Sequence, residues 1–200
     1  MELNNYYGLL VLLLTTMACL AATIISHSIT LVDVSLTILG CIYPGIALFS
    51  LLFLGNIAES YVPYMLILTF FATWSTDTFA YFIGIKFGKN KLCPNISPKK
   101  TVEGSIGGIV GSIAVSILVG WIFKYIYQVP LSFYHYIIIS LLCGFTSQIG
   151  DLTASTIKRF CNIKDFGRIL PGHGGLLDRF DSIMFTAPIV YVYYLLFLTP

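Results

Sequence analysis

The polar chemistry of this 200-residue chain is concentrated in one short stretch near its C-terminus, residues 155–181. It holds five of the eleven Lys and Arg residues and three of the nine Asp and Glu residues. These residues are Lys158, Arg159, Lys164, Arg168 and Arg179, with Asp165, Asp178 and Asp181. A glycine-bearing turn, residues 171–175, lies within it. Because Arg and Lys bind phosphate and clustered carboxylates bind hard cations, the stretch predicts a site for a polyanionic substrate and a metal.

Two further acids lie inside apolar segments. Asp77 lies nine residues before Lys86, and Asp151 lies seven residues before Lys158. At 1.5 Å of helix per residue these separations are about 13 and 10 Å. With the two aspartates at 178 and 181, four carboxylates are therefore expected at the same end of their helices. Ionisable groups within a membrane span usually mark function, although pairing of each acid with a neighbouring base as structural support is the alternative.

Asp178 and Asp181 are three residues apart and would share one face if a helix has begun by then. Two like charges held close together in an apolar environment call for a counter-cation. Since all the ligands would be oxygens, a hard ion such as Mg²⁺ is expected.

A second basic segment, residues 86–100, carries five lysines. Lys99 and Lys100 are the two that we expect to contact phosphate, because a Ser97-Pro98 turn signal and a run of glycines flank them. The Glu103 carboxylate could accept a hydrogen bond from a ribose hydroxyl, pair with a lysine or bind a metal. The sequence leaves these three roles open.

His173 lies among glycines, whereas His27 and His135 lie in or beside apolar spans. We therefore expect His173 to be the functional histidine, as a general acid, a phosphate donor or a structural hydrogen-bonding group. It is not expected to bind metal, because a second His or Cys at a suitable spacing is missing from the sequence.

The elements that must position these residues are membrane helices. The chain is 57% hydrophobic and 10% charged, with a mean hydropathy of +0.88, whereas soluble domains carry about 25% charged residues. Apolar segments of near-spanning length, which takes about 20 residues, predict six helices. They are residues 6–26, 34–55, 61–85, 105–123, 132–152 and 182–199. The first lacks a positive n-region and is expected to be a retained helix rather than a cleaved signal. We expect an all-α polytopic protein with one membrane domain, residues 1–200.

Ten of the eleven basic residues fall in two loops, 86–100 and 158–179, and Lys124 lies elsewhere. Cytoplasmic loops accumulate Lys and Arg, so both loops are predicted to be cytoplasmic and both termini external. The catalytic portion is expected over residues 70–182, with its cytoplasmic loops at 86–104 and 156–181.

The polar positions also match a known signature. The chain contains the pattern Ser155-x-x-Lys158-Arg159-x-x-x-x-Lys164-Asp165-x-Gly167-x-x-Leu170-Pro171-Gly172-His173-Gly174-Gly175-x-x-Asp178-Arg179-x-Asp181. Upstream it contains Asp77-x-x-Ala80-Tyr81-x-x-Gly84, Phe87-Gly88-Lys89 and Ser97-Pro98-x-Lys100-Thr101-x-Glu103-Gly104. Over residues 70–182 the chain closely resembles the phosphatidate cytidylyltransferase family, whose members are usually longer at the N-terminus.

The resemblance implies that CTP and phosphatidic acid react to CDP-diacylglycerol and pyrophosphate at the cytoplasmic face of the cell membrane, with Mg²⁺ either alone or together with a second metal ion. Asp151, Asp178 and Asp181 would be the metal-associated acids. The expected catalytic set is Asp151, Asp178, Asp181, Lys158 and His173. The expected substrate-binding set is Asp77, Ser97, Lys99, Lys100, Glu103, Lys158, Arg159, Lys164 and Arg179.

The residues agree with this reaction, because the attacking phosphate oxygen is already anionic and needs no strong base. The alternatives are a CTP-dependent polyprenol kinase and a transporter with intramembrane acids. No P-loop or GxGxxG turn is present, so a soluble nucleotide-binding fold is not supported. Nucleic acid is not an expected partner. Small residues from Gly104 to Ser112 suggest close helix packing, within one chain or in a homodimer.

Overall fold

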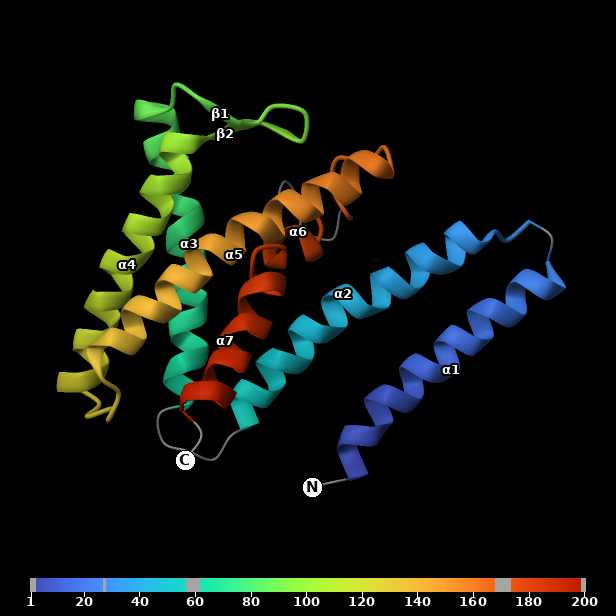
Figure 1. Ribbon diagram of the computed structural model, residues 1–200, viewed down its shortest axis with the longest axis horizontal. Coiled ribbons are helices and arrows are strands. Elements are labelled where there is room, and N and C mark those ends of the chain that lie inside the picture. The colour runs from blue at the N-terminus through green and yellow to red at the C-terminus, as the bar shows by residue number, and fades with distance from the viewer. Residues whose placement is uncertain (1–2, 27, 57–61, 168–173, 199–200) are drawn as a thin grey trace. The chain divides into compact units, whose positions relative to one another are not determined.

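The computed structural model describes residues 3–26, 28–56, 62–167 and 174–198, which are mostly helical (Figure 1). Each of the six predicted apolar spans coincides with a helix. These helices are α1 (Leu3–Ile25), α2 (Leu31–Asn56), α3 (Val62–Phe87), α4 (Val102–Tyr125), α5 (Phe133–Phe160) and α7 (Ile183–Phe197). Four of them, α2 to α5, are long and apolar enough to cross a membrane, and Leu13–Ile25 and Ile183–Phe197 are shorter apolar helices. The predicted all-α, polytopic membrane protein is confirmed.

The chain divides into two compact units, Met1–Ile46 and Ala47–Pro200. In the first unit, Thr30 and Asp33 begin α2. The N–H and hydroxyl of Thr30 donate to the Asp33 carboxylate at 2.8 and 2.7 Å, and the Asp33 N–H donates back to the Thr30 hydroxyl. Such reciprocal bonds satisfy donors that a helix start leaves unpaired. The second unit contains every described position that the sequence marked as functional.

In the second unit, a short hairpin joins α3 to α4 (Figure 1). Strands β1 (Lys91–Cys93) and β2 (Ser97–Thr101) are antiparallel, with Lys91 opposite Thr101 and Cys93 opposite Ser97. The Ser97-Pro98 turn signal was wrong: both residues belong to β2, and residues 94–96 form the turn. Proline is tolerated there because an edge strand does not need every N–H for pairing.

Glycines bring α4 close to α3. A Cβ at Gly104 would lie 2.6 Å from the carbonyl oxygen of Ala80, and a Cβ at Gly108 would lie 2.7 Å from that of Thr76. Real Cβ atoms do not approach backbone oxygens so closely, so these positions require glycine. The small-residue row that suggested close packing is therefore used within one chain, and the homodimer stays a hypothesis.

Replacing Gly108 with alanine should weaken this contact. We expect Gly108→Ala to lower the free energy of unfolding by about 1–3 kcal/mol, as overpacking of a tight interface does. Gly55→Ala is the matched control, because a Cβ there has nothing within 4 Å. Chemical unfolding in detergent, followed by circular dichroism, measures both. Equal stability of the two variants would contradict the close α3–α4 approach.

Helices α4 and α5 are also antiparallel, and their contacts advance in register along both helices. From the hairpin end inward, the contacting pairs are Ser105 with Gln148, Ile109 with Gly144, and Ser112 with Ser140. Hydroxyl groups buried between the helices mostly donate to backbone carbonyls; Thr69 and Thr73 bond the residue four positions earlier, and Thr73 also bonds Thr186 at 3.0 Å. The bonds to the backbone four residues earlier stay within α3, whereas the Thr73–Thr186 bond joins α3 to α7, as hydroxyl groups often do between membrane helices.

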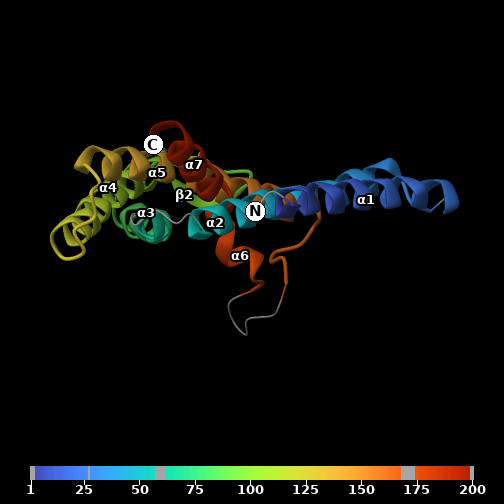
Figure 2. The same cartoon turned by 90° about the horizontal axis from the view of Figure 1, so that it is seen from below.

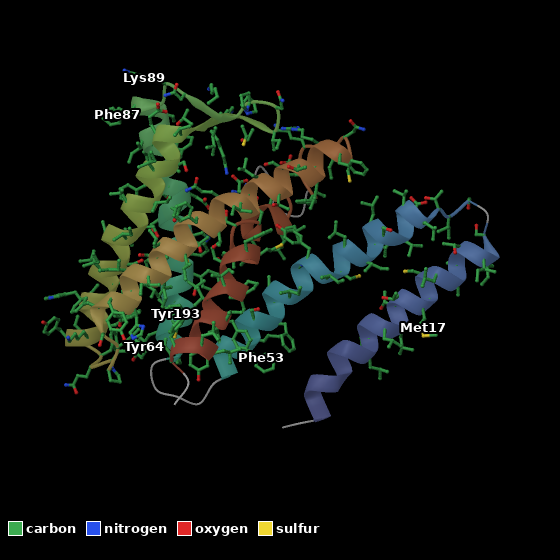
Figure 3. All side chains as sticks on the ribbon, in the orientation of Figure 1. Met17, Phe53, Tyr64, Phe87, Lys89 and Tyr193 are labelled. Carbon is green, nitrogen blue, oxygen red and sulfur yellow. The ribbon has the colours of Figure 1, made fainter. Side chains whose placement is uncertain are left out.

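The apolar core lies at the end of the second unit remote from the hairpin. Figure 3 shows Tyr64 and Tyr193 at this end, and Phe87 and Lys89 at the other. The core includes Tyr136, whose ring covers Gly120 so closely that a Cβ there would lie 2.8 Å from the ring. Packing in this core holds the helices of the second unit together, and the polar side chains gather at the hairpin end.

Two departures from the predicted spans affect the site. Helix α5 extends eight residues beyond the apolar span that ends at 152 and terminates at Phe160. Lys158 and Arg159 therefore belong to the helix that carries Asp151, as the helical spacing of Asp151 and Lys158 implied. The chain after α5 and the short helix α6 (Leu177–Phe180) lie to one side of α5 and α7, as Figure 2 shows. Helix α7 begins at Ile183, so Asp178 belongs to the short α6 and Asp181 follows it.

Candidate active site

Four separate parts of the second unit bring polar side chains together at the hairpin end. Asp77 comes from α3, Lys100 from β2, Asp151 from α5, and Asp181 from the turn before α7. The carboxylate of Asp77 interacts electrostatically with the other three groups. The predicted convergence of these groups on one end of the helices is therefore present in the structure.

Lys100 and Asp151 form an ion pair between the hairpin and α5. Their side chains are 24% and 30% exposed, so substrate could reach both. Thr101 fixes the position of Lys100, because its hydroxyl caps α4 by accepting from the Gly104 N–H at 3.1 Å. Gly88 leaves room for the Thr101 side chain; a Cβ at Gly88 would lie 2.6 Å from the Thr101 methyl group.

The carboxylates of Asp151 and Asp181 lie close enough to repel each other. Gly150 allows this approach, since a Cβ there would lie 2.7 Å from the Asp181 carbonyl oxygen. Burial, and then repulsion by Asp151, raises the pKa of Asp181 to about 6. Ser182 supports the cluster: its N–H donates to Asp181 at 2.8 Å, and its side chain hydrogen-bonds Asp77.

Asp178 organises the segment between α5 and α6. One carboxylate oxygen accepts from Lys158 Nζ at 2.7 Å, and the other accepts from the N–H groups of Phe166 and Gly175 at 2.8 and 3.0 Å. Burial alone would raise the pKa of Asp178, but these hydrogen bonds outweigh it and hold the pKa below its usual value. Gly174 adopts a φ of +80° beside this carboxylate, a conformation that favours glycine.

The acidic side chains of the site meet part of what a hard cation needs for binding. Asp77, Asp151 and Asp181 supply carboxylate oxygens from three elements, and a divalent cation would offset their mutual repulsion. In the described ranges no three acidic, His or Cys side chains are close enough to enclose an ion as they stand. Asp178 is engaged with Lys158 and backbone N–H groups, and its assignment as a metal ligand stays a prediction.

Glu103 has contacts that the sequence did not suggest. Its carboxylate accepts from the backbone N–H groups of Lys89 and Asn90 at 3.0 and 3.2 Å, and from Asn90 Nδ2 at 2.8 Å. It therefore holds the connection between α3 and β1 at the start of α4. The structure shows none of the three roles that the sequence left open. It shows instead that Glu103 stabilises the hairpin that carries Lys100.

The remaining predicted residues lie around this cluster. Ser97 begins β2 and is partly buried, whereas Lys99, Arg159, Lys164 and Arg179 are exposed. The predictions for His173 and Arg168 fall outside the described residues. Sequence reasoning missed Ser182, Ser105 and Gln148. Gln148 could have been identified, because it is a glutamine within an apolar span and a buried amide needs hydrogen-bonding partners.

Two comparisons with known proteins show the family to which the chain belongs. Residues 1–197 match the model of a family described as the cytidylyltransferase family. The phosphatidate cytidylyltransferase of Bacillus subtilis (strain 168) is 40% identical over 190 residues, covering 94% of this chain and 66% of that protein. That of Staphylococcus saprophyticus is 38% identical over 172 residues, covering 86% of this chain and 63% of that protein. The chain thus spans slightly less than two thirds of the length of these relatives.

Proposed function

Because the chain belongs to the cytidylyltransferase family, we propose that it transfers the cytidylyl group of CTP to phosphatidic acid, forming CDP-diacylglycerol and pyrophosphate. The observation that carries the proposal is the meeting of Asp77, Lys100, Asp151 and Asp181 at one end of apolar helices. A lipid substrate and a water-soluble nucleotide can meet at such a boundary between bilayer and water.

The reaction needs charge neutralisation more than acid–base chemistry. A phosphate oxygen of phosphatidic acid forms a bond to the α-phosphorus of CTP, and the bond from that phosphorus to the pyrophosphate oxygen breaks. The attacking oxygen is already anionic near neutral pH, so a strong base is not required. Catalysis of such transfers rests on positioning and on stabilising the charge that develops.

The basic residues have distinct positions for this task. Lys100 reaches the acidic cluster from the hairpin, and Lys158 lies seven residues beyond Asp151 on α5. Both are paired with a carboxylate, which keeps each cation in place before phosphate arrives. Arg159 is exposed at the end of α5 and supplies a planar donor for a phosphate of CTP or of the lipid. Lys99, Lys164 and Arg179 extend the positive surface.

A bound Mg²⁺ would supply charge neutralisation at the phosphates of CTP. Asp151 and Asp181, with Asp77 beside them, are the side chains that would hold it, and Asp178 would keep Lys158 in place nearby. Binding of the cation to Asp151 would free Lys100 to contact phosphate. The positive-inside rule supports placing this end of the helices at the cytoplasmic face of the cell membrane.

The distribution of charge favours an enzyme over a transporter. In the part of the chain that the structure describes, buried polar side chains are hydroxyl groups apart from His135, and Thr69, Thr73 and Thr76 bond backbone carbonyls. The paired carboxylates and lysines gather instead at the hairpin end.

Pyrophosphate release tests the proposal. The purified chain in detergent micelles should release pyrophosphate from CTP when phosphatidic acid and Mg²⁺ are both present. Micelles containing diacylglycerol, which lacks the nucleophilic phosphate, are the matched control and should give no release. Release that does not depend on phosphatidic acid, or none in any mixture, would contradict the proposal.

A further inference from the structure

Gln148 lies one turn before Asp151 on α5, and its side-chain amide is fully engaged. Its Oε1 accepts a hydrogen bond from the Ser105 hydroxyl on α4. Its Nε2 donates to the backbone carbonyl of Ser105 at 3.2 Å and to that of Gly144 at 2.9 Å. Since both neighbours of Nε2 are carbonyl oxygens, the orientation of the amide is determined.

This amide joins the same two parts of the chain that carry the Lys100–Asp151 ion pair. Ser105 follows Lys100 by five residues, and Gln148 precedes Asp151 by three. The link therefore lies about one helical turn deeper than the ion pair. One turn deeper again, α4 and α5 touch through Ile109 and Gly144, an apolar contact without directional bonds. Deeper still, the Ser112 hydroxyl bonds the Ser140 carbonyl at 3.4 Å, a long bond between the same two helices.

The hydrogen bonds of Gln148 restrict rotation and sliding of α4 against α5, which the apolar contact between Ile109 and Gly144 does not. An apolar interface permits small rotations and slips of one helix along another, whereas hydrogen bonds with defined donors and acceptors do not. A carbonyl or amide left without a partner in such surroundings is also costly. Rotation of α4 would carry Lys100 away from Asp151, because Thr101, the N-cap of α4, directly follows Lys100.

We propose that Gln148 is a positioning residue for the transfer reaction: through Ser105 it sets the register of α4 against α5, so that Lys100 and Asp151 meet. This inference rests on the proposed function. Gln148 acts on the reaction indirectly, through the Lys100–Asp151 ion pair.

Gln148→Met tests the inference, because methionine keeps the length of the side chain and removes all three hydrogen bonds. We expect kcat to fall about 10- to 100-fold, as small misplacements of reacting groups cause. The KM for CTP should change by less than about threefold, since Lys158 and the other phosphate-binding residues stay in place.

Ser112→Ala is the matched control. Ser112 lies two turns deeper than Ser105 on α4, and its hydroxyl bonds the Ala72 carbonyl on α3 at 2.9 Å and, more weakly, the Ser140 carbonyl on α5 at 3.4 Å. Ser112→Ala should lower the midpoint of thermal unfolding by about 2–4 °C, the shift that about 1 kcal/mol gives, and Gln148→Met by at least as much, because it loses more bonds. Ser112→Ala should keep kcat within about twofold. An equal effect on kcat in the two variants, or none in Gln148→Met, would overturn the inference.

A second measurement separates this inference from the proposed function. Thermal midpoints of Gln148→Met, Lys100→Met and the double variant, without substrates, form a double-mutant cycle. A double variant less destabilised than the sum of the single shifts supports the link from Gln148 to Lys100. Additive shifts contradict it. If the wild-type chain fails to convert CTP while the cycle is non-additive, the proposed function fails and the positioning of Lys100 by Gln148 stands.

Discussion

Asp151→Asn should lower kcat/KM for CTP about 10³-fold, at the upper end of the loss of 10²–10³ seen on removing one electrostatic contact to a transition state. Asp151 is paired with Lys100 and lies against Asp181, so its charge holds Lys100, and in the proposed reaction it would also bind the cation. The asparagine side chain keeps the shape of the aspartate but lacks its negative charge. Incorporation of labelled CTP into lipid, measured over a range of CTP and Mg²⁺ concentrations, gives the ratio.

Asp33→Asn is the control for the change in net charge. Asp33 caps α2 in the first unit and is not one of the residues assigned to the proposed site. Asp33→Asn should keep kcat/KM within about twofold, with only a small loss of stability from the weakened bonds to Thr30. Turnover by folded Asp151→Asn within about tenfold of wild type would remove Asp151 from the catalytic group.

Asp178→Asn should lower turnover about 10²-fold and also destabilise the protein, by about 1–3 kcal/mol. The side chains of Lys158 and Asp178 are 13% and 6% exposed, so the substitution would leave a buried ammonium group without its counter-charge. It would also weaken the bonds from the N–H groups of Phe166 and Gly175 that order the segment before α6. Chemical unfolding and the lipid-incorporation assay measure the two effects.

The double variant Lys158→Met/Asp178→Asn distinguishes the two roles of this pair. Removing both charges should restore part of the stability, because no buried charge is then unpaired. Activity should stay low, because Lys158 is then missing from the phosphate-binding group. Recovery of activity together with stability would show that the pair is structural support and that Lys158 does not contact substrate.

The helical spans could be predicted because membrane helices follow directly from apolar length. Hydropathy does not give their ends: the apolar part of α5 stops near residue 152, whereas the helix continues through polar residues to Phe160, as the spacing of Asp151 and Lys158 implied. The hairpin was missed. Its strands contain Lys91, Pro98 and Lys99, residue types that are depleted in strands, and it is stabilised by its fixed ends at Glu103 and Thr101 instead.

The site could be predicted in outline, because the acids and bases had to lie at one end of their helices. Which acid pairs with which base depends on helix rotation, which sequence spacing does not determine. Lys100 and Asp151 are 51 positions apart, and their pairing follows from the packing of α4 on α5. The bonds of Asp178 to Phe166 and Gly175 depend on the path of the chain between α5 and α6.

The central claim is that this site attaches the cytidylyl group of CTP to a lipid phosphate. The most direct measurement compares CTP labelled with ³²P at the α-phosphate with CTP labelled at the γ-phosphate, each incubated with the purified chain, phosphatidic acid and Mg²⁺. Cytidylyl transfer predicts that chloroform-extractable label appears from the α-labelled nucleotide and not from the γ-labelled one. Lipid labelled from the γ-phosphate instead would show a CTP-dependent kinase and would contradict the account.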